Sequence, residues 1–209
     1  MKAVIQIVLL AVIIVLGYLL YESIMKPIRF NNEKETIENA TIQRLKDIRS
    51  AQVAFKSEYS KYTSDFDSLI TFVKNGTFSV VKAIGSIPDS LLEAGMTERE
   101  AVKQGLISRD TVKVNVLDSL FSAVYPIDSL RYVPYAGSTE FALGVGVIVT
   151  GSKVKVPVFE AKVPYNILLA DLDPQLVINY TEEREKITGY PGLRVGSLTE
   201  ATNNAGNWE

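Results

Sequence analysis

The chain has 209 residues, of which 47% are apolar, and it carries 22 basic and 24 acidic side chains. That length allows one domain, or one domain with an anchor, and the apolar share is enough for a core. Cys and His are both absent, which excludes thiol nucleophiles, imidazole bases, thiolate zinc sites and disulfides. The charge balance provides no basic excess for phosphates, so nucleic acid is not an expected partner.

The N-terminal segment predicts a membrane anchor. Ala3 to Tyr21 is uncharged, and its one strongly polar side chain is Gln6. As a helix it would span about 28 Å, close to the hydrocarbon thickness of a bilayer. A cleaved signal peptide is the alternative, but its apolar region is normally shorter and followed by small residues, whereas this segment ends in "GYLLYES". We therefore expect an uncleaved transmembrane anchor over residues 1–25, with Tyr18 and Tyr21 at the interface.

The charges that flank this segment bear on its orientation. Lys2 lies on one side, and Lys26 and Arg29 lie on the other. A long domain translocates largely regardless of its charge, whereas the N-terminal tail is very short. We expect a single-pass inner-membrane protein with a cytoplasmic N-terminus and a periplasmic head, whose first partner is the lipid bilayer.

A long helix is expected to follow the anchor. Pro27 should kink or break the chain, after which apolar and aromatic residues recur every three or four positions. The stripe consists of Leu45, Ile48, Gln52, Phe55, Tyr59 and Tyr62. Its first turns, rich in Asn, Glu and Lys, predict a solvated stalk, and its second half predicts a helix packed on the head.

This part of the chain resembles the N-terminal third of type IV pilins and of the pseudopilins of type II secretion. In those families a membrane helix runs into an amphipathic helix that ends in an "A-Q-x-A-Y … G-x-Y-T … L" pattern. The matching positions are Ala51, Gln52, Ala54, Phe55, Ser60, Tyr62, Thr63 and Leu69. The resemblance covers residues 1–75 and implies an anchor, a helical stalk and an exported head. The processing motif of the family is absent, as is the carboxylate that its membrane helix carries.

Capping patterns predict two further helices. Ser64 and Asp67 have the spacing of a capping box, and a helix of about ten residues should end near Gly76. Thr97 and Glu100 have the same spacing before a second helix. The segment between them, residues 77–95, is expected to wrap the head.

The periodicity then becomes that of strands. Alternating or β-rich runs occur at 111–117, 131–135, 140–150, 153–163, 165–170, 175–180 and 193–195. The runs at 140–150 and 153–163 predict a hairpin with a turn at 150–153. Pro157 and Pro164 place the second run at a sheet edge or at bulges. The chain should therefore form an α+β head with an antiparallel β-sheet.

Few residues suggest chemistry. Asp171 and Asp173 could hold a hard cation or act as an acid/base pair, but a turn before Pro174 accounts for them more simply. Ser152 and Lys153 could form a nucleophilic dyad, although both residue types are common in hairpin turns. We expect a protein that is not an enzyme, without catalytic, cofactor-binding or metal-binding residues.

An Asp-Ser/Thr-aliphatic tripeptide recurs five times, where average composition predicts roughly one match or fewer. It resembles the O-glycosylation acceptor of Bacteroidota, which occurs on exported proteins. Under that resemblance the acceptors are Ser68, Ser90, Thr111, Ser119 and Ser129. Asp-Ser pairs also begin helices and turns, so a purely structural origin stays open.

The expected organisation is an anchor at 1–25, a helical stalk with a capped second helix at 26–76, and an α+β head at 77–209. We expect a non-catalytic structural or assembly subunit of a cell-envelope complex, which associates with itself or with other envelope proteins through anchor and stalk. The alternative is a tethered periplasmic module that binds a ligand or polymer, and it requires a pocket in the head.

Overall fold

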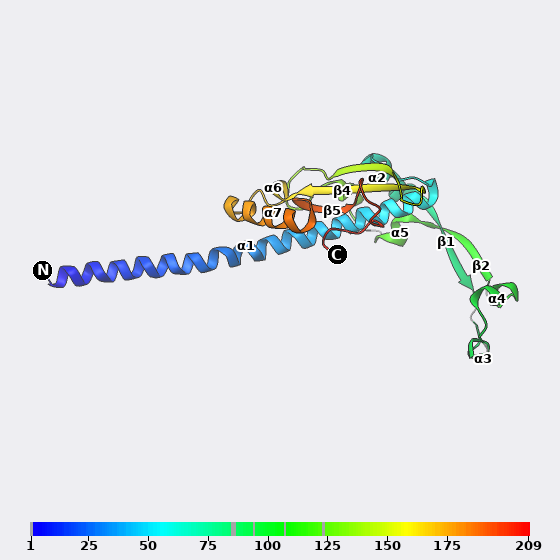
Figure 1. Ribbon diagram of the computed structural model, residues 1–209, viewed down its shortest axis with the longest axis horizontal. Coiled ribbons are helices and arrows are strands. Elements are labelled where there is room, and N and C mark those ends of the chain that lie inside the picture. Colours follow the sequence, from blue (N-terminus) through cyan, green and yellow to red (C-terminus); the bar gives the residue numbers. More distant parts are fainter. Residues whose placement is uncertain (1, 85–86, 94, 107, 123) are drawn as a thin grey trace.

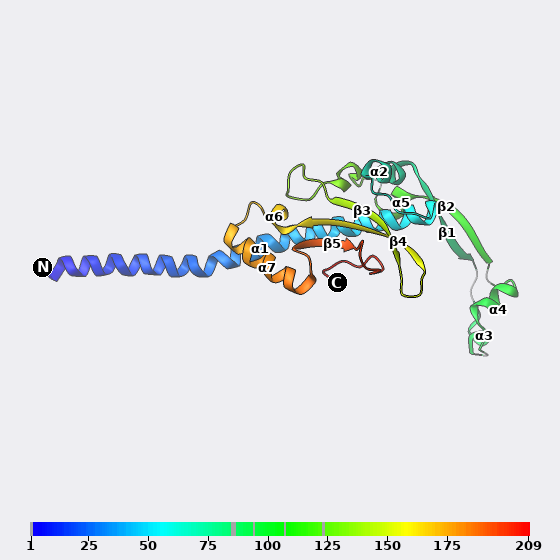
Figure 2. The same cartoon turned by 45° about the horizontal axis from the view of Figure 1, so that its top comes forward.

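The computed structural model describes residues 2–84, 87–93, 95–106, 108–122 and 124–209. One long helix leads into a head with antiparallel sheets, so the chain is an α+β protein as predicted. The elements are α1 (Lys2–Tyr59), α2 (Phe66–Asn75), β1 (Thr77–Ile84), α3 (Asp89–Glu93), α4 (Glu98–Lys103), β2 (Ser108–Asn115), α5 (Val116–Leu120), η1 (Ile127–Arg131), β3 (Ala142–Val149), β4 (Lys155–Pro164), α6 (Tyr165–Leu168), α7 (Pro174–Thr188) and β5 (Gly192–Gly196). The head surrounds the second half of α1, and the first half extends away from it (Figures 1 and 2).

Helix α1 is continuous from Lys2 to Tyr59 and contains Pro27. Of the predicted kink or break at this proline, the break is therefore wrong. A proline removes one backbone hydrogen bond and crowds the preceding turn. The Glu22 carboxylate and the Arg29 guanidinium lie 2.6 Å apart and bridge the turns on either side of it. This cross-turn ion pair favours continuation of the helix.

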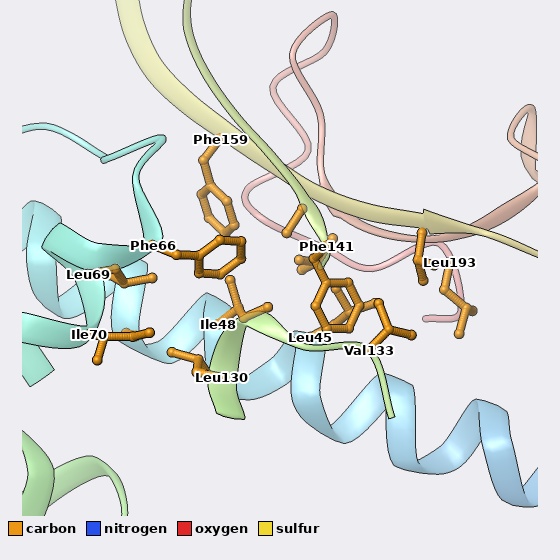
Figure 3. Packing of buried hydrophobic residues seen from close by; sticks show 14 of the residues in the cluster. Leu45, Ile48, Phe66, Leu69, Ile70, Leu130, Val133, Phe141, Phe159 and Leu193 are labelled. Carbon is orange, nitrogen blue, oxygen red and sulfur yellow. The ribbon is translucent and has the colours of Figure 1, made fainter. Parts of the chain in front are cut away.

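The core of the head is built on the second half of α1. Leu45 and Ile48 are fully buried. Ile48 lies beside Phe66 of α2, with Phe159 of β4 on the far side of Phe66, and Leu45 lies beside Phe141 (Figure 3). Most of the predicted stripe is buried as expected, because positions three or four apart share one helix face. Tyr59, at the end of the helix, is the exception and is 53% exposed.

The described residues of the head form two sheets. β3, β4 and β5 form an antiparallel sheet in that order, and the predicted hairpin is confirmed as β3 and β4. The predicted edge position of the second run is wrong, since β4 is the central strand. Both prolines of β4 are tolerated because of where they lie. β5 pairs only with Glu160 to Pro164, so β4 has no strand on that side at Pro157. Pro164 is the last residue of β4.

The other sheet is an arm. β1 and β2 pair antiparallel and, with α3 and α4, project away from the head (Figures 1 and 2). The described residues of the segment 77–95 therefore leave the head instead of wrapping it. The predicted strand at 111–117 is confirmed up to Asn115, the last residue of β2, and α5 begins at Val116.

Four further local predictions need correction. The runs at 165–170 and 175–180 lie in α6 and α7 instead of strands, because short apolar runs do not separate strand from helix. The run at 131–135 pairs only through the bridge between Tyr132 and Glu140. The N-cap of α2 is Asp65 instead of Ser64, whereas the capping box of Thr97 and Glu100 is confirmed.

Candidate membrane anchor and its junction with the head

The first part of α1 is an apolar helix without a protein partner in the described structure. Its large apolar side chains from Ile5 to Tyr21 are all between 47% and 67% exposed. By length and composition this helix can cross a membrane. Water is an unfavourable environment for so long an apolar surface. The prediction of a helix suited to span a bilayer is confirmed, and Tyr18 and Tyr21 lie at its end.

The junction between this segment and the head begins with an ion pair. Lys26 Nζ on α1 lies 2.8 Å from Asp173 Oδ2. The Asp173 carboxylate also caps α7, since it accepts hydrogen bonds from the backbone N–H groups of Gln175 and Leu176. The hydrogen bond from Lys26 is the main reason that the pKa of Asp173 lies below its ordinary value, followed by the Leu176 N–H. One carboxylate thus joins the start of α7 to the anchor helix.

Aromatic packing continues the junction one turn further along α1. Phe30 is buried and meets the Tyr180 ring of α7 edge to face at 6.5 Å. Tyr180 donates its hydroxyl to Glu38 Oε1 at 2.7 Å, and Lys34 Nζ lies 4.2 Å above its ring. Burial, and then the bond to Glu38, raise the pKa of Tyr180 to about 12. The predicted solvated stalk is therefore covered on one face by α7.

Beyond α7 the helix enters the core, where one buried amide fixes its end. Gln52 is fully buried. Its Nε2 donates to the Thr63 carbonyl at 2.6 Å, and its Oε1 accepts from the Thr63 N–H at 3.2 Å. Both backbone groups of Thr63 are satisfied, so the chain is held where it turns from α1 toward α2. Ser60 makes that turn with a φ of +59°.

The positions that carry the pilin resemblance have structural roles here. Ala51, Ala54, Phe55, Tyr62 and Leu69 are all buried in the core of the head. Packing of the helix end against α2 and β4 therefore accounts for the apolar part of the pattern.

Several contacts between α1 and distant segments were not predicted. Tyr125 donates its hydroxyl to Asp47 Oδ2 at 2.5 Å, and burial followed by this bond raises its pKa. Arg49 Nη1 lies 2.7 Å from a carboxylate oxygen of Glu209, the last residue. Because the partners are 78 and 160 residues apart, no local pattern could have revealed them. The segment before η1 and the C-terminus are thus both held against α1.

The residues that suggested chemistry are used in the fold or lie apart. Asp173 is the cap described above, and Asp171 is exposed. Lys153 lies in the β3–β4 turn with a φ of +59° and donates its N–H to the Thr150 carbonyl. No group of three or more acidic, Cys or His side chains in the described part of the chain is placed to hold a metal ion.

The candidate glycan acceptors differ in accessibility. Ser119 on α5 is exposed. Ser68 on α2 is exposed, and its hydroxyl donates to Asp65 Oδ2 at 2.6 Å. Ser129 in η1 is half-buried; its hydroxyl donates to the Pro126 carbonyl and accepts from Arg44 at 2.7 Å. The side chains of Ser90 and Thr111 lie outside the described residues.

An open groove lies where α1 meets the base of the arm. Val53 of α1, Phe78 of β1 and Leu120 of α5 line its apolar wall, and Arg49 and Asn204 line its polar end. Val53 is 47% exposed, which makes this the most accessible apolar position of the second half of α1 apart from Tyr59. The groove is one concave surface of the kind that a ligand-binding function uses.

Comparison of the chain with protein-family models, with curated proteins and with solved structures finds no match. The fold and the junction define an α+β protein whose N-terminal helix can cross a membrane and whose head is built on the same helix. Function is therefore argued from these contacts.

Proposed function

We propose that the chain is a membrane-anchored, non-catalytic structural or assembly subunit of a cell-envelope complex, with a pilin-like topology. The anchor crosses the inner membrane once, with the N-terminus in the cytoplasm and the head in the periplasm. Copies associate with each other, or with other envelope proteins, through the anchor and the adjoining part of α1.

The observation that carries this proposal is the continuity of α1. One helix, Lys2–Tyr59, contains the exposed apolar segment and also the centre of the head's core. A module that only needs to stay near a membrane works with a flexible linker. Here Lys26, Phe30 and Glu38 tie the head to the helix directly after the apolar segment. The position of the head therefore follows the position of the anchor, which suits a building block.

Residue chemistry supports the non-catalytic part of the proposal. Without His or Cys, acid–base or nucleophilic catalysis would depend on carboxylates, Lys, Tyr or Ser. The two aspartates that suggested a site are not used together, since Asp173 binds Lys26 and caps α7.

The test is crosslinking in native membranes. Ser23, exposed at the end of the apolar segment, is replaced by Cys in this Cys-free chain, and membranes are treated with a short bis-maleimide. Because each variant chain carries one thiol and the reagent has two maleimides, we expect a crosslinked dimer. In the matched control, residues 2–21 are replaced by an unrelated single-span helix, which should leave mostly monomer. Monomers only from the native anchor would contradict the proposal.

The second candidate is a tethered periplasmic module that binds a ligand or polymer, and the groove at Val53, Phe78 and Leu120 favours it. It predicts that Val53→Lys abolishes binding of a periplasmic polymer such as peptidoglycan while Ser23→Cys yields monomers only. Unchanged polymer binding in this variant would exclude the groove as its site.

A further inference from the structure

Strand β3 is an unprotected edge of the three-stranded sheet. It lies outside β4 in the order β3-β4-β5, and no charged residue or proline occurs from Phe141 to Ser152. Natural sheets normally blunt exposed edges with charges, prolines or bulges, because an open edge pairs readily with other strands. The opposite edge is covered, since Asn207 donates its N–H to the Arg194 carbonyl of β5.

The backbone of β3 has unused pairing capacity. The N–H of Phe141, just before the strand, donates to the Arg131 carbonyl, away from β4. By alternation, Leu143, Val145 and Val147 point their N–H and C=O groups to the same side. Among the described residues, no backbone partner is found for those groups. On one face of the strand, Val145, Val147 and Val149 are 40%, 63% and 60% exposed.

The arm is a ribbon of only two strands, β1 and β2, and would gain from a third. A ribbon of two strands is marginally stable by itself in water. Its opposed Val80 and Val112 are 37% and 41% exposed. β2 carries three charged residues, whereas β1 carries one, Lys82. The edge of β1 is therefore the less protected one, and β1 and β3 are both eight residues long.

We propose that β1 of one copy pairs with β3 of a neighbouring copy, an inference that rests on the proposed function. The contact would give the arm a third strand and would pair the open backbone groups of β3. It would also place Val80 of one copy beside the β3 valines of the next, as cross-strand neighbours. Because two different surfaces meet, the contact is heterologous and joins copies into a ring or a filament.

Pairing of β3 with β3 of another copy is less suitable. The β3–β4 hairpin lies along α1 (Figures 1 and 2). An antiparallel two-fold pairing would point the two α1 helices in opposite directions, so that both anchors could not enter one bilayer. A parallel pairing about an axis along the strands would turn the two valine rows to opposite faces of the sheet.

The experiment again uses the absence of Cys. The variants Val80→Cys and Val147→Cys, in otherwise intact chains with tags of different size, are expressed together, and native membranes are treated with a short bis-maleimide. We expect a product of mixed size that needs both variants. The matched control pairs Val80→Cys with Ile178→Cys, whose wild-type side chain on α7 is 51% exposed, and should give none.

Each other outcome overturns the proposal. A Val147→Cys homodimer would indicate pairing of β3 with itself. A product between Val147→Cys and a different protein, without Val80→Cys, would indicate another occupant of the edge. If no β1–β3 product forms while Ser23→Cys still yields the crosslinked dimer, assembly through the anchor stands and only the arm contact falls. If both fail, the proposed function falls as well.

A second pair of variants tests the contact by adding a charge to the β3 edge. Val147→Lys, combined with Val145→Cys, places a charge on the open edge and should lower the yield with Val80→Cys about tenfold. Ile178→Lys with Val145→Cys should keep it. Since Val147 is 63% exposed, the substitution leaves the core intact, and circular dichroism of both variants verifies folding. Equal yields from the two would contradict the arm contact.

Discussion

Lys26 on α1 and Asp173 at the start of α7 lie 2.8 Å apart, nitrogen to carboxylate oxygen. Lys26 follows the apolar segment by only a few residues, and Asp173 belongs to the head almost 150 residues later. The pair therefore marks the level at which the head first closes on the anchor helix, and Phe30 and Tyr180 extend the same junction.

The ion pair between Lys26 and Asp173 predicts how the stability of the folded protein changes at acid pH. The folded-state pKa of Asp173 lies below its ordinary value of 3.8. Its stabilising contribution is therefore complete above that value and is lost as pH falls through the lowered pKa. Asp173→Asn should lower the unfolding temperature at neutral pH, and its difference from the wild type should shrink below about pH 4.

Two variants serve as comparisons for this prediction. Lys26→Ala should lower the unfolding temperature by less than Asp173→Asn does, because the Leu176 and Gln175 N–H groups still bind Asp173. Asp171→Asn, at an exposed neighbouring acid, should behave as the wild type. Thermal unfolding in detergent across pH 3 to 7 measures all three. A difference for Asp173→Asn that does not change with pH would refute the linkage.

The buried amide of Gln52 should be essential for stability. Gln52→Leu removes both partners of Thr63, and buried backbone groups without partners cost about 1–3 kcal/mol each. We expect a loss of about 2 kcal/mol or more in the free energy of unfolding. Gln43→Leu, at an exposed Gln on the same helix, should change it by less than about 0.5 kcal/mol. Denaturant unfolding followed by circular dichroism compares the two, and equal losses would contradict the role assigned to Gln52.

Truncation should separate the anchor from the part of α1 that builds the core. Removal of residues 1–25 leaves Phe30, Leu45 and Ile48 in place, so we expect a head that folds in water. Removal of residues 1–48 deletes these buried side chains and should prevent folding. Dispersed amide signals in NMR spectra would report a folded head. Dispersion in the shorter product would show that the core does not depend on α1.

The accessibility of the serine hydroxyls predicts which of the candidate acceptors carry a glycan. If the tripeptide is an O-glycan signal, Ser119 should carry a glycan, because it is exposed. Ser129 should not, because its hydroxyl binds Arg44 and the Pro126 carbonyl. Mass spectrometry of the protein from its native membrane checks both, with Ser119→Ala and Ser129→Ala as controls. A glycan on Ser129 alone would contradict this order.

Periodicity predicted the elements whose pattern is local. The buried stripe from Leu45 to Tyr62 and the β3–β4 hairpin follow directly from spacings of three to four and of two. The β-rich run at 175–180 predicts a strand but lies in α7, whose start is marked by Asp173 as N-cap and Pro174 in the first turn. The junction itself depends on contacts such as Tyr180 with Glu38, which are 142 residues apart, so no sequence window could contain both partners.

The membrane attachment of the intact chain tests the account most directly. Native membranes are washed with high salt and with alkaline carbonate, then extracted with a mild detergent, and the N-terminus of the extracted protein is sequenced. The account predicts that the chain stays with the lipid until detergent is added and that its N-terminus lies before the apolar segment that ends at Tyr21. Release without detergent, or a mature N-terminus beyond Tyr21, would contradict it.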